Sequence, residues 1–316
     1  MQQPVPDTVV VAAVQAGPAF LDRDRSVEKA CRWIRAAGQG GARIVVLPEV
    51  FIPGGPYWAW AFGFRQSMPF NVELFQNSVE VPGPETGALG EAARAAGAYV
   101  VIGVNERDNR TIYNTLLYFD DQGTMLGKHR KFKPTGAEKL VWGEGDGSTH
   151  RVYPTPYGKL GGLICGEHTM QLPGYTLGVM GEQIHAAVWI GFSVADTSLT
   201  EVCSRFYAIA NNAHVIVSQS VVTPEIVERV GAPGIRVGNA WSAVLEMGTG
   251  KVLAGPLAPT DEGVVYATLD LRGAPAHYFI HEPTGHYRPK EFTVLFDPRP
   301  NRPVELAGAE RQPPEG

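Results

Sequence analysis

The order of short apolar runs and one helical pattern in the first fifty residues constrains the fold more than any other feature. Residues 9–15 have the length and character of a buried strand, and residues 43–47 form a second such run. Between them, residues 26–37 carry apolar side chains at helical spacing, and Gly38 follows as a stop signal. This strand–helix–strand order predicts an α/β fold with a mixed or parallel sheet covered by helices.

The same kinds of pattern continue along the chain. Further strands are predicted at 99–104, 113–119, 125–128, 159–164, 185–190, 215–218, 240–246, 252–254 and 264–270. Helices are predicted at 85–96 and 197–212, a loop with a short helix at 52–64, and a loop at 222–238. Residues 1–295 are interpreted as one domain. Residues 296–316 are interpreted as a C-terminal tail, part of a Pro- and Arg-rich arm that docks on a partner subunit or stays disordered.

Composition and charge exclude several classes of protein. The 316 residues carry a formal net charge of -5, which argues against nucleic acid as the main partner. The three cysteines include no Cys-x-x-Cys pair, so neither a disulfide framework nor a cysteine zinc site is indicated, and no metal is expected. The apolar run at residues 8–16 is too short to span a membrane. These features favour a soluble protein of the reducing cytoplasm.

Cys165 lies where the predicted strand 159–164 gives way to a polar turn. Open α/β sheets expose their reactive groups at the ends of strands, so a thiol here is a candidate nucleophile. The backbone amides of the following turn can face a developing negative charge. The alternative is a packing role, because free cysteine is among the most buried residue types.

Two other polar side chains also follow predicted strands. Glu49 comes just after the strand 43–47, where a carboxylate is costly unless it is paired or used, and a turn or cap role is the alternative. Lys131 lies in a basic cluster after the strand 125–128, where it can face a substrate or belong to a solvated surface. The aromatic residues Tyr57 and Trp58 either pack in the core or wall an apolar pocket.

Glu49, Lys131 and Cys165 together supply a base, a cation and a soft nucleophile, which suffices to attack a polarised carbon–nitrogen bond. A thiol with a reference pKa of about 8.5 is mostly protonated at neutral pH, so it needs a base or a cation beside it. Glu49 can take the proton, and Lys131 can stabilise the charge that builds on the substrate. A Cys–His pair is the alternative, with His168 as the nearest candidate, although a separation of three residues does not establish the geometry.

The chain resembles the nitrilase superfamily, and within it the nitrilase branch. The resemblance covers residues 8–295 and is carried by the segments 13–16, 47–54, 56–58, 130–138, 143–147, 162–167 and 285–289. Three departures are present. Gly166 stands where the family often has Trp, Gly55 stands where it often has Tyr, and the segment 285–289 is one residue short. The first two lie near the expected pocket and bear on substrate range rather than on the chemistry.

The resemblance implies an α/β fold, a four-layer α-β-β-α sandwich formed with a partner subunit, and a homo-oligomer in which dimers build larger spirals. It also implies a site without cofactor in which Cys165 is the nucleophile, Glu49 the general base and Lys131 the cation beside the tetrahedral intermediate. Glu138 matches the second glutamate of the family, which holds the lysine. The amide of Gly166 would help to bind the negative charge.

The expected activity is the hydrolysis of an organic nitrile, as small-molecule substrate, to its carboxylic acid and ammonia through a thioimidate and a thioester on the cysteine. Tyr57, Trp58, Gly166 and His168 are the candidate substrate-binding residues, although the position of His168 also fits a structural role. An amidase or N-carbamoyl amide hydrolase with the same site is the alternative enzyme. A catalytically silent oligomeric binding protein is the alternative from another class.

Overall fold

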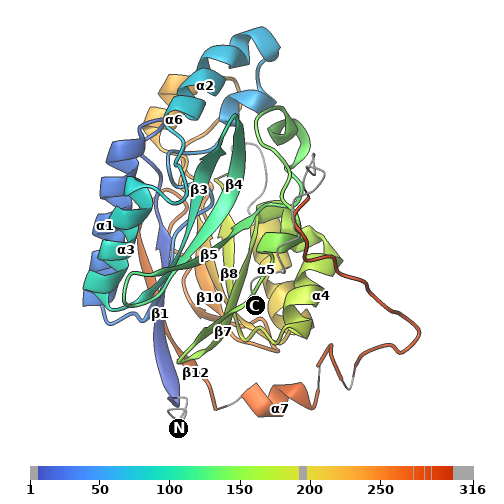
Figure 1. The fold of residues 1–316 in the computed structure, drawn as a ribbon. Helices are drawn as coiled ribbons and strands as arrows, with labels where there is room; N and C mark the ends of the chain where they lie inside the picture. The colour runs from blue at the N-terminus through green and yellow to red at the C-terminus, as the bar shows by residue number, and fades with distance from the viewer. Residues whose placement is uncertain (1–5, 192–197, 273, 281, 286, 302–316) are drawn as a thin grey trace, which may run out of the picture.

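The computed structural model describes residues 6–191, 198–272, 274–280, 282–285 and 287–301. It contains two six-stranded sheets that pack face to face (Figure 1). The first sheet has the order β12-β1-β2-β3-β4-β5, with strands Thr8–Gln15 (β1), Ile44–Val46 (β2), Tyr99–Asp108 (β3), Thr111–Phe119 (β4), Met125–Arg130 (β5) and Gly263–Asp270 (β12). The second has the order β11-β10-β9-β8-β7-β6, with strands Tyr153–Thr155 (β6), Gly158–Ile164 (β7), Ile184–Trp189 (β8), His214–Gln219 (β9), Ala243–Leu245 (β10) and Val252–Ala254 (β11).

Both sheets share one plan. Strands β1, β2 and β3 run parallel in the first sheet, as do β7, β8 and β9 in the second. The neighbouring strands on either side are antiparallel. The sheets are therefore mixed, as predicted. Because the carboxyl ends of parallel strands meet at one edge of a sheet, each sheet can present functional side chains there.

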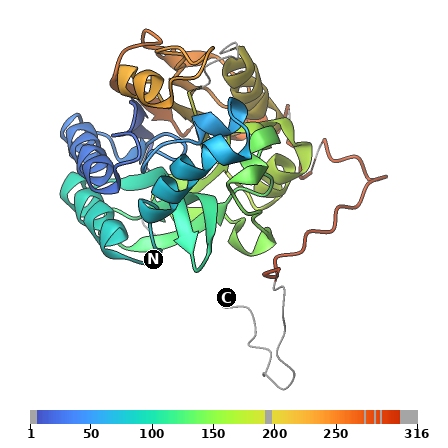
Figure 2. The ribbon, with the colours of Figure 1, turned by 90° about the horizontal axis from the view of Figure 1, so that it is seen from above.

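Helices cover the outer faces of the two sheets (Figure 2). Helices α1 (Arg23–Gln39) and α3 (Pro84–Ala96) lie side by side over the first sheet, and α4 (Gln171–Val179) and α5 (Ser198–Ala210) lie over the second. One apolar core fills the space between the sheets, and another lies between the first sheet and its helices. The mixed α/β fold with two sheets agrees with the sequence analysis.

Helix α1 illustrates how local sequence produces these elements. Asp22 is its N-cap and accepts a hydrogen bond from the backbone of Arg25 at 2.9 Å, which satisfies one of the amides left free at a helix start. Val27, Ala30 and Ile34 are buried on the face toward the sheet. Cys31, on the same helix, is also buried in the core, as expected from the helical spacing of the apolar residues in this segment.

Several elements are absent from the sequence predictions, among them β6, α2 (Phe64–Gln76), α6 (Pro224–Val230) and α7 (Ala274–Tyr278). Strand β6 has three residues and α7 five, so both are too short to leave a periodic pattern. Helix α2 contains Pro69, which interrupts a helical pattern. Helix α6 lies inside the predicted loop 222–238, although Pro at its first position and Gly231 after its end are start and stop signals. The predicted helix 197–212 is observed from Ser198 to Ala210, and Thr197 lies outside the described residues.

The described part of the C-terminal arm runs outside the body of the fold (Figure 1). It returns to its own chain at two points. The ring of Phe296 lies 5.6 Å from the ring of His150, and the backbone N–H of Asn301 donates to Asp146 at 2.7 Å. Residues 302–316 lie outside the described residues, so the predicted tail 296–316 is described only in part. None of the described helices combines the length and the apolar character needed to cross a membrane.

Candidate active site

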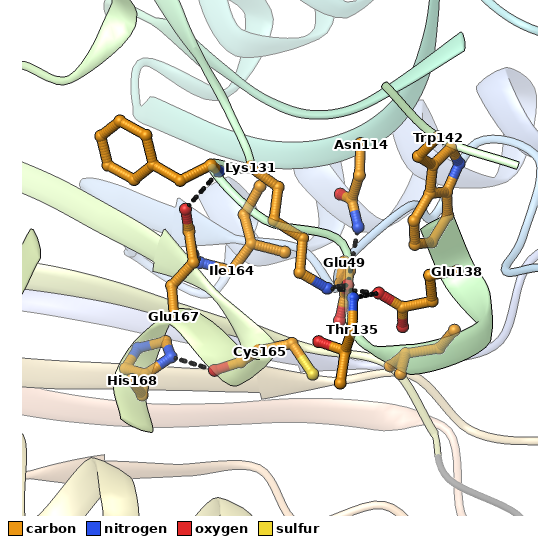
Figure 3. Close-up of polar contacts among 12 residues, drawn as sticks. Glu49, Asn114, Lys131, Thr135, Glu138, Trp142, Ile164, Cys165, Glu167 and His168 are labelled. Atoms are coloured by element: carbon orange, nitrogen blue, oxygen red, sulfur yellow. Dashed lines mark hydrogen bonds and ion pairs between the residues drawn. The ribbon is translucent and has the colours of Figure 1, made fainter. Parts of the chain in front are cut away.

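Glu49, Lys131 and Cys165 lie at strand ends and meet between the two sheets (Figure 3). Glu49 follows β2 and Lys131 follows β5, both in the first sheet, whereas Cys165 follows β7 in the second. Each of the three side chains is at most 2% exposed. The two sheets therefore contribute different parts of one site, with the base and cation on one and the thiol on the other.

Lys131 is held between two carboxylates. Its Nζ atom lies 3.0 Å from Oε1 of Glu49 and 2.9 Å from Oε2 of Glu138. Glu138, in the short helix η2 (Gly136–Leu140), also accepts the backbone N–H of Thr135 at 2.8 Å. Asn114 on β4 donates to Oε1 of Glu49 at 2.7 Å. A buried charge is costly unless it is paired and hydrogen-bonded, and this arrangement satisfies both conditions for the ammonium group.

The surroundings determine which of these groups carries charge. Burial raises the pKa of Glu49, which Lys131 lowers and Glu138 raises again, and the net shift is upward. Burial alone would lower the pKa of Lys131, but the acidic groups around it outweigh burial and raise its pKa. Burial and the charge of Glu49 raise the pKa of the Cys165 thiol well above its ordinary range, against the opposing effect of Lys131. The resting thiol is therefore protonated, and Glu49 is a nearby base with a raised pKa.

One oxygen of Glu49 is available for that proton. Oε1 accepts from both Asn114 and Lys131, whereas Oε2 is buried and has no hydrogen-bond partner among the described residues. Oε2 is therefore the oxygen of Glu49 that can accept a proton without breaking a hydrogen bond seen in the structure. Figure 3 shows the Cys165 sulfur on the side of the turn where Glu49, Lys131 and Glu138 lie.

Cys165 has a strained backbone. Its φ of 50° lies in the left-handed region, which a residue other than glycine adopts at a cost of about 1–3 kcal/mol. It begins the short helix η4 (Cys165–Thr169), and the backbone of Gly166 faces the thiol and lowers its pKa. A side chain at Gly166 would approach the Thr135 hydroxyl to 2.9 Å, so the glycine keeps the space beside the sulfur narrow but open.

Glu167 joins the cysteine strand to the lysine strand. Its carboxylate accepts the backbone N–H of Phe132 at 2.7 Å and that of Ile164 at 2.9 Å, and it lies 3.0 Å from Nε2 of His129. Burial opposes ionisation, but His129 and the two amides outweigh it and lower the pKa of Glu167 to about 2. Glu167 therefore fixes residues next to Cys165 and Lys131 relative to each other.

The other predicted substrate-binding residues occupy different places. The charge of Glu49 adds to burial in raising the pKa of Tyr57, which puts this hydroxyl in electrostatic range of the site. Trp58 donates to Asn71 at 2.7 Å and stacks on Phe70, with ring centroids 5.1 Å apart, as a packing residue does. His168 uses both ring nitrogens within the protein, and its contacts favour the structural role.

Asn114 and Glu167 are the functional residues that the sequence analysis did not assign. Asn114 follows no distinctive pattern, because it comes beside Glu49 only through the pairing of β2, β3 and β4, and beside Lys131 through the pairing of β4 with β5. Glu167 has a local signal, since it is a charged residue three positions after the end of a buried strand, where an unpaired carboxylate would be costly. Among the described residues, no group of three or more His, Cys, Asp and Glu side chains could hold a metal ion.

Comparison with known proteins assigns the chain to a family. Residues 10–276 match the family described as carbon-nitrogen hydrolase. A protein of Bacillus sp. (strain OxB-1) named nitrilase is 36% identical over 313 residues, covering 96% of this chain and 92% of that protein. One of Rhodococcus rhodochrous named aliphatic nitrilase is 36% identical over 317 residues, covering 95% of this chain and 86% of that protein. The chain therefore belongs to the carbon-nitrogen hydrolase family.

Its position within the family is the nitrilase branch, because these relatives are named nitrilases and match nearly the whole chain. This confirms the resemblance seen in the sequence. Among solved structures, the carbon-nitrogen hydrolase of Helicobacter pylori G27 has a TM-score of 0.74 at 20% identity, covering 90% of this chain and 97% of that one. That likeness supports the fold.

Proposed function

We propose that this protein is a nitrilase, which converts an organic nitrile and two water molecules to the carboxylic acid and ammonia. The observation that carries the proposal is the Lys131 ammonium within 3.0 Å of both Glu49 and Glu138, beside a buried thiol on a strained turn. Relatives named nitrilase at 36% identity over most of the chain support the choice of a nitrile over an amide.

In the proposed reaction Cys165 gives its proton to Glu49 as its sulfur attacks the nitrile carbon. Glu49 then passes this proton to the nitrile nitrogen, and the product is a thioimidate. The buried ammonium of Lys131 and the amide of Gly166 stabilise the negative charge that develops on that nitrogen, which is worth most in a site shielded from water. Glu138 holds Lys131 in place through the 2.9 Å contact.

Two hydrolytic steps then release the products. Glu49 takes a proton from water as the water adds to the thioimidate carbon, and passes that proton to the nitrogen. The carbon–nitrogen bond then breaks as the new hydroxyl group gives its proton to the nitrogen, so that ammonia leaves and the carbonyl of a thioester forms. The resulting thioester is attacked by a second water, activated in the same way, and the carbon–sulfur bond breaks. The acid is released, and the Cys165 thiol is restored with its proton.

The test is ammonia release from aromatic, arylaliphatic and aliphatic nitriles, measured beside the matching amides. We expect release from at least one class of nitrile, and no release by the Cys165→Ala variant. Cys203→Ala is the matched control, because Cys203 is a free cysteine on α5, outside the site, and its loss should leave activity unchanged. Release from amides alone would show an amidase or N-carbamoyl amide hydrolase instead, and silence on both would leave the fold without this activity.

A homo-oligomer and a reducing cytoplasm are part of the proposal. Large apolar side chains are exposed on α5 and on the arm, including Val202, Phe206 and Leu295, and these favour burial against a second copy that would complete a four-layer α-β-β-α sandwich. The substitution Phe206→Glu should shift the mass measured by light scattering toward a smaller species.

The tail boundary near residue 295 can be tested with a chain ending there. A reactive thiol also favours a reducing compartment.

A further inference from the structure

A chain of buried polar side chains lies behind Cys165, on the side away from Lys131. His168 Nδ1 lies 2.8 Å from the carbonyl oxygen of Cys165, a contact drawn in Figure 3, and its Nε2 lies 3.0 Å from Nε2 of His185. His185 Nδ1 lies 2.8 Å from Oε1 of Glu182. Tyr207 on α5 donates to Oε2 of Glu182 at 2.5 Å. We name the series from Glu182 through His185 and His168 to the Cys165 carbonyl the acid–imidazole chain.

Counting protons determines the state of this chain. It contains three contacts, and each contact needs one proton between its two heavy atoms. The carbonyl of Cys165 can only accept, so His168 must carry its proton on Nδ1. A neutral His168 then accepts at Nε2, so His185 must carry its proton on Nε2. A neutral His185 accepts at Nδ1, so the third proton has to come from the carboxyl group of Glu182.

The surroundings favour these neutral forms. Burial and the neighbouring His185 lower the pKa of His168 to about 3, and burial lowers the pKa of His185 well below its ordinary value. Burial raises the pKa of Glu182 to about 8, although the hydrogen bond from Tyr207 lowers it. Gly161 leaves room for the acid, because a side chain there would come within 2.1 Å of Oε1 of Glu182.

Other titratable groups face the acid–imidazole chain from neighbouring helices and strands. Tyr207 comes from α5, and Tyr118 on β4 lies in electrostatic range of Glu182. Glu167 on η4 raises the pKa of His185, and His129 on β5 lowers it. For His168, the charge of Glu167 raises the pKa and that of Lys131 lowers it. The described groups that contact Glu182 directly are uncharged, so no cation there stabilises an ionised carboxylate.

We propose that Glu182, His185 and His168 form a positioning device that holds the strained carbonyl of Cys165, and that Glu182 works in its protonated form. The proposal rests on the nitrilase function proposed above. Loss of the acid proton leaves two protons for three contacts. If the imidazoles then change tautomer, so that His185 donates to the carboxylate and His168 to His185, the Nδ1 lone pair of His168 faces the Cys165 carbonyl. Deprotonation at Glu182 thereby releases the backbone of the nucleophile.

The decisive variant is Glu182→Gln. Glutamine can donate its amide proton to His185 and accept from Tyr207, so it reproduces the protonated acid and cannot ionise. We expect its kcat at neutral pH to stay close to that of the wild type, while the fall of kcat near pH 8 in the wild type disappears. Glu182→Ala should lower kcat by about 100-fold, because the nucleophile is no longer held in position.

Two further variants sharpen the pH profile. Tyr207→Phe removes the hydrogen bond that lowers the pKa of Glu182, so the alkaline fall of kcat should move to higher pH. His214→Gln is the matched control, because His214 is a buried histidine on β9 that does not belong to the acid–imidazole chain. Its loss should leave the alkaline fall of kcat unchanged.

A measurement without substrate separates this proposal from the nitrilase function. In protein labelled with 15N-histidine, nitrogen chemical shifts at pH 7 should show His168 protonated on Nδ1 and His185 protonated on Nε2 only. A doubly protonated His185, or the opposite tautomers, would overturn the proposal even in an active nitrilase. It would also be overturned if Glu182→Gln kept the alkaline fall or lost as much kcat as Glu182→Ala.

Discussion

Glu167 and Glu182 are both fully buried, both contact a histidine, and lie on different sides of the Cys165 turn, yet their pKa values are shifted in opposite directions. The pKa of Glu167 is lowered to about 2, whereas that of Glu182 is raised to about 8. The charge of His129 and the hydrogen bonds from His129 and two backbone N–H groups lower the pKa of Glu167. For Glu182 only the hydrogen bond from Tyr207 lowers the pKa, and burial outweighs it. The difference teaches that the partners of a buried carboxyl group, rather than burial alone, set its charge here.

Buried acidic groups around the site are accommodated in two ways. On the side of Glu49 and Lys131, charges are kept and paired. On the side of Glu182, charge is avoided by retaining a proton. A nucleophile between these regions has a charged environment in front for chemistry and a neutral one behind for support. Four substitutions, taken from the largest expected effect to the smallest, test this division.

Lys131→Met should have the largest effect, because it leaves Glu49 and Glu138 buried without their cation. We expect a loss of about 3–5 kcal/mol in the free energy of unfolding, measured with urea, and a fall in kcat of about 100-fold or more. Lys128→Met is the matched control, because the partner of Lys128, Glu106, keeps its ion pair with Arg130. Equal stability of Lys131→Met and the wild type would contradict the charged state of this side.

Glu167→Gln should destabilise the protein by about 3 kcal/mol at neutral pH, since the two backbone amides donate to different oxygens of Glu167 and glutamine replaces one of these oxygens with an NH2 group that cannot accept. The effect depends on pH with a definite sign. The pKa of Glu167 is lowered from 4.5 to about 2, so its stabilisation is complete above pH 4.5 and is lost as pH falls toward 2. Urea titrations should therefore show the gap between wild type and variant closing over that interval. A gap that stayed constant down to pH 2 would mean that the charge contributes nothing.

Gly161→Ala should disturb the neutral side by steric means. Its new methyl group would lie 2.1 Å from Oε1 of Glu182, and overpacking of this kind costs about 1–3 kcal/mol. Gly87→Ala on α3 is the comparison, because nothing lies within 4 Å of the position of its methyl group and alanine favours a helix. Thermal melting should place the two variants on opposite sides of the wild type. An unchanged melting temperature of Gly161→Ala would show that the space around Glu182 is not tight.

Asn114→Ala should have the smallest effect on stability, about 1 kcal/mol, and a larger one on the pH profile. The hydrogen bond from Asn114 lowers the pKa of Glu49, so its removal should raise that pKa further. Because the base works deprotonated, the acidic limb of kcat should move to higher pH. Asn71→Ala, which loses a contact with Trp58 instead, should leave that limb in place. If the acidic limb of kcat did not move in Asn114→Ala, the group that titrates there would not be Glu49.

The sequence predicted the parts of this arrangement that depend on strand ends. Glu49, Lys131 and Cys165 each follow an apolar run, and their convergence follows from the rule that functional groups gather at the carboxyl edge of a sheet. Glu138 was found only through the family resemblance, because its contact with Lys131 depends on the path of a short helix.

The acid–imidazole chain was beyond sequence reasoning for a different reason. Its members lie on η4, on β8 and in the turn before β8, and the local sequence around each of them gives no sign of the others. The same holds for Asn114, which reaches Glu49 only when β2, β3 and β4 have paired. Local patterns specify where a strand ends, whereas the protonation state of a buried group depends on contacts made by the whole fold.

The double acceptance by Glu167 has a mechanical consequence. Phe132 belongs to the segment that leaves the first sheet, and Ile164 is the last residue of a strand of the second, so one carboxylate spans the seam between them. Because Glu167 follows β7 of the second sheet, sliding of one sheet over the other must stretch its hydrogen bond from Phe132 and its contact with His129. The Lys131 ammonium follows a strand of the first sheet and the Cys165 sulfur a strand of the second. The rate of turnover therefore depends on how well the two sheets stay aligned.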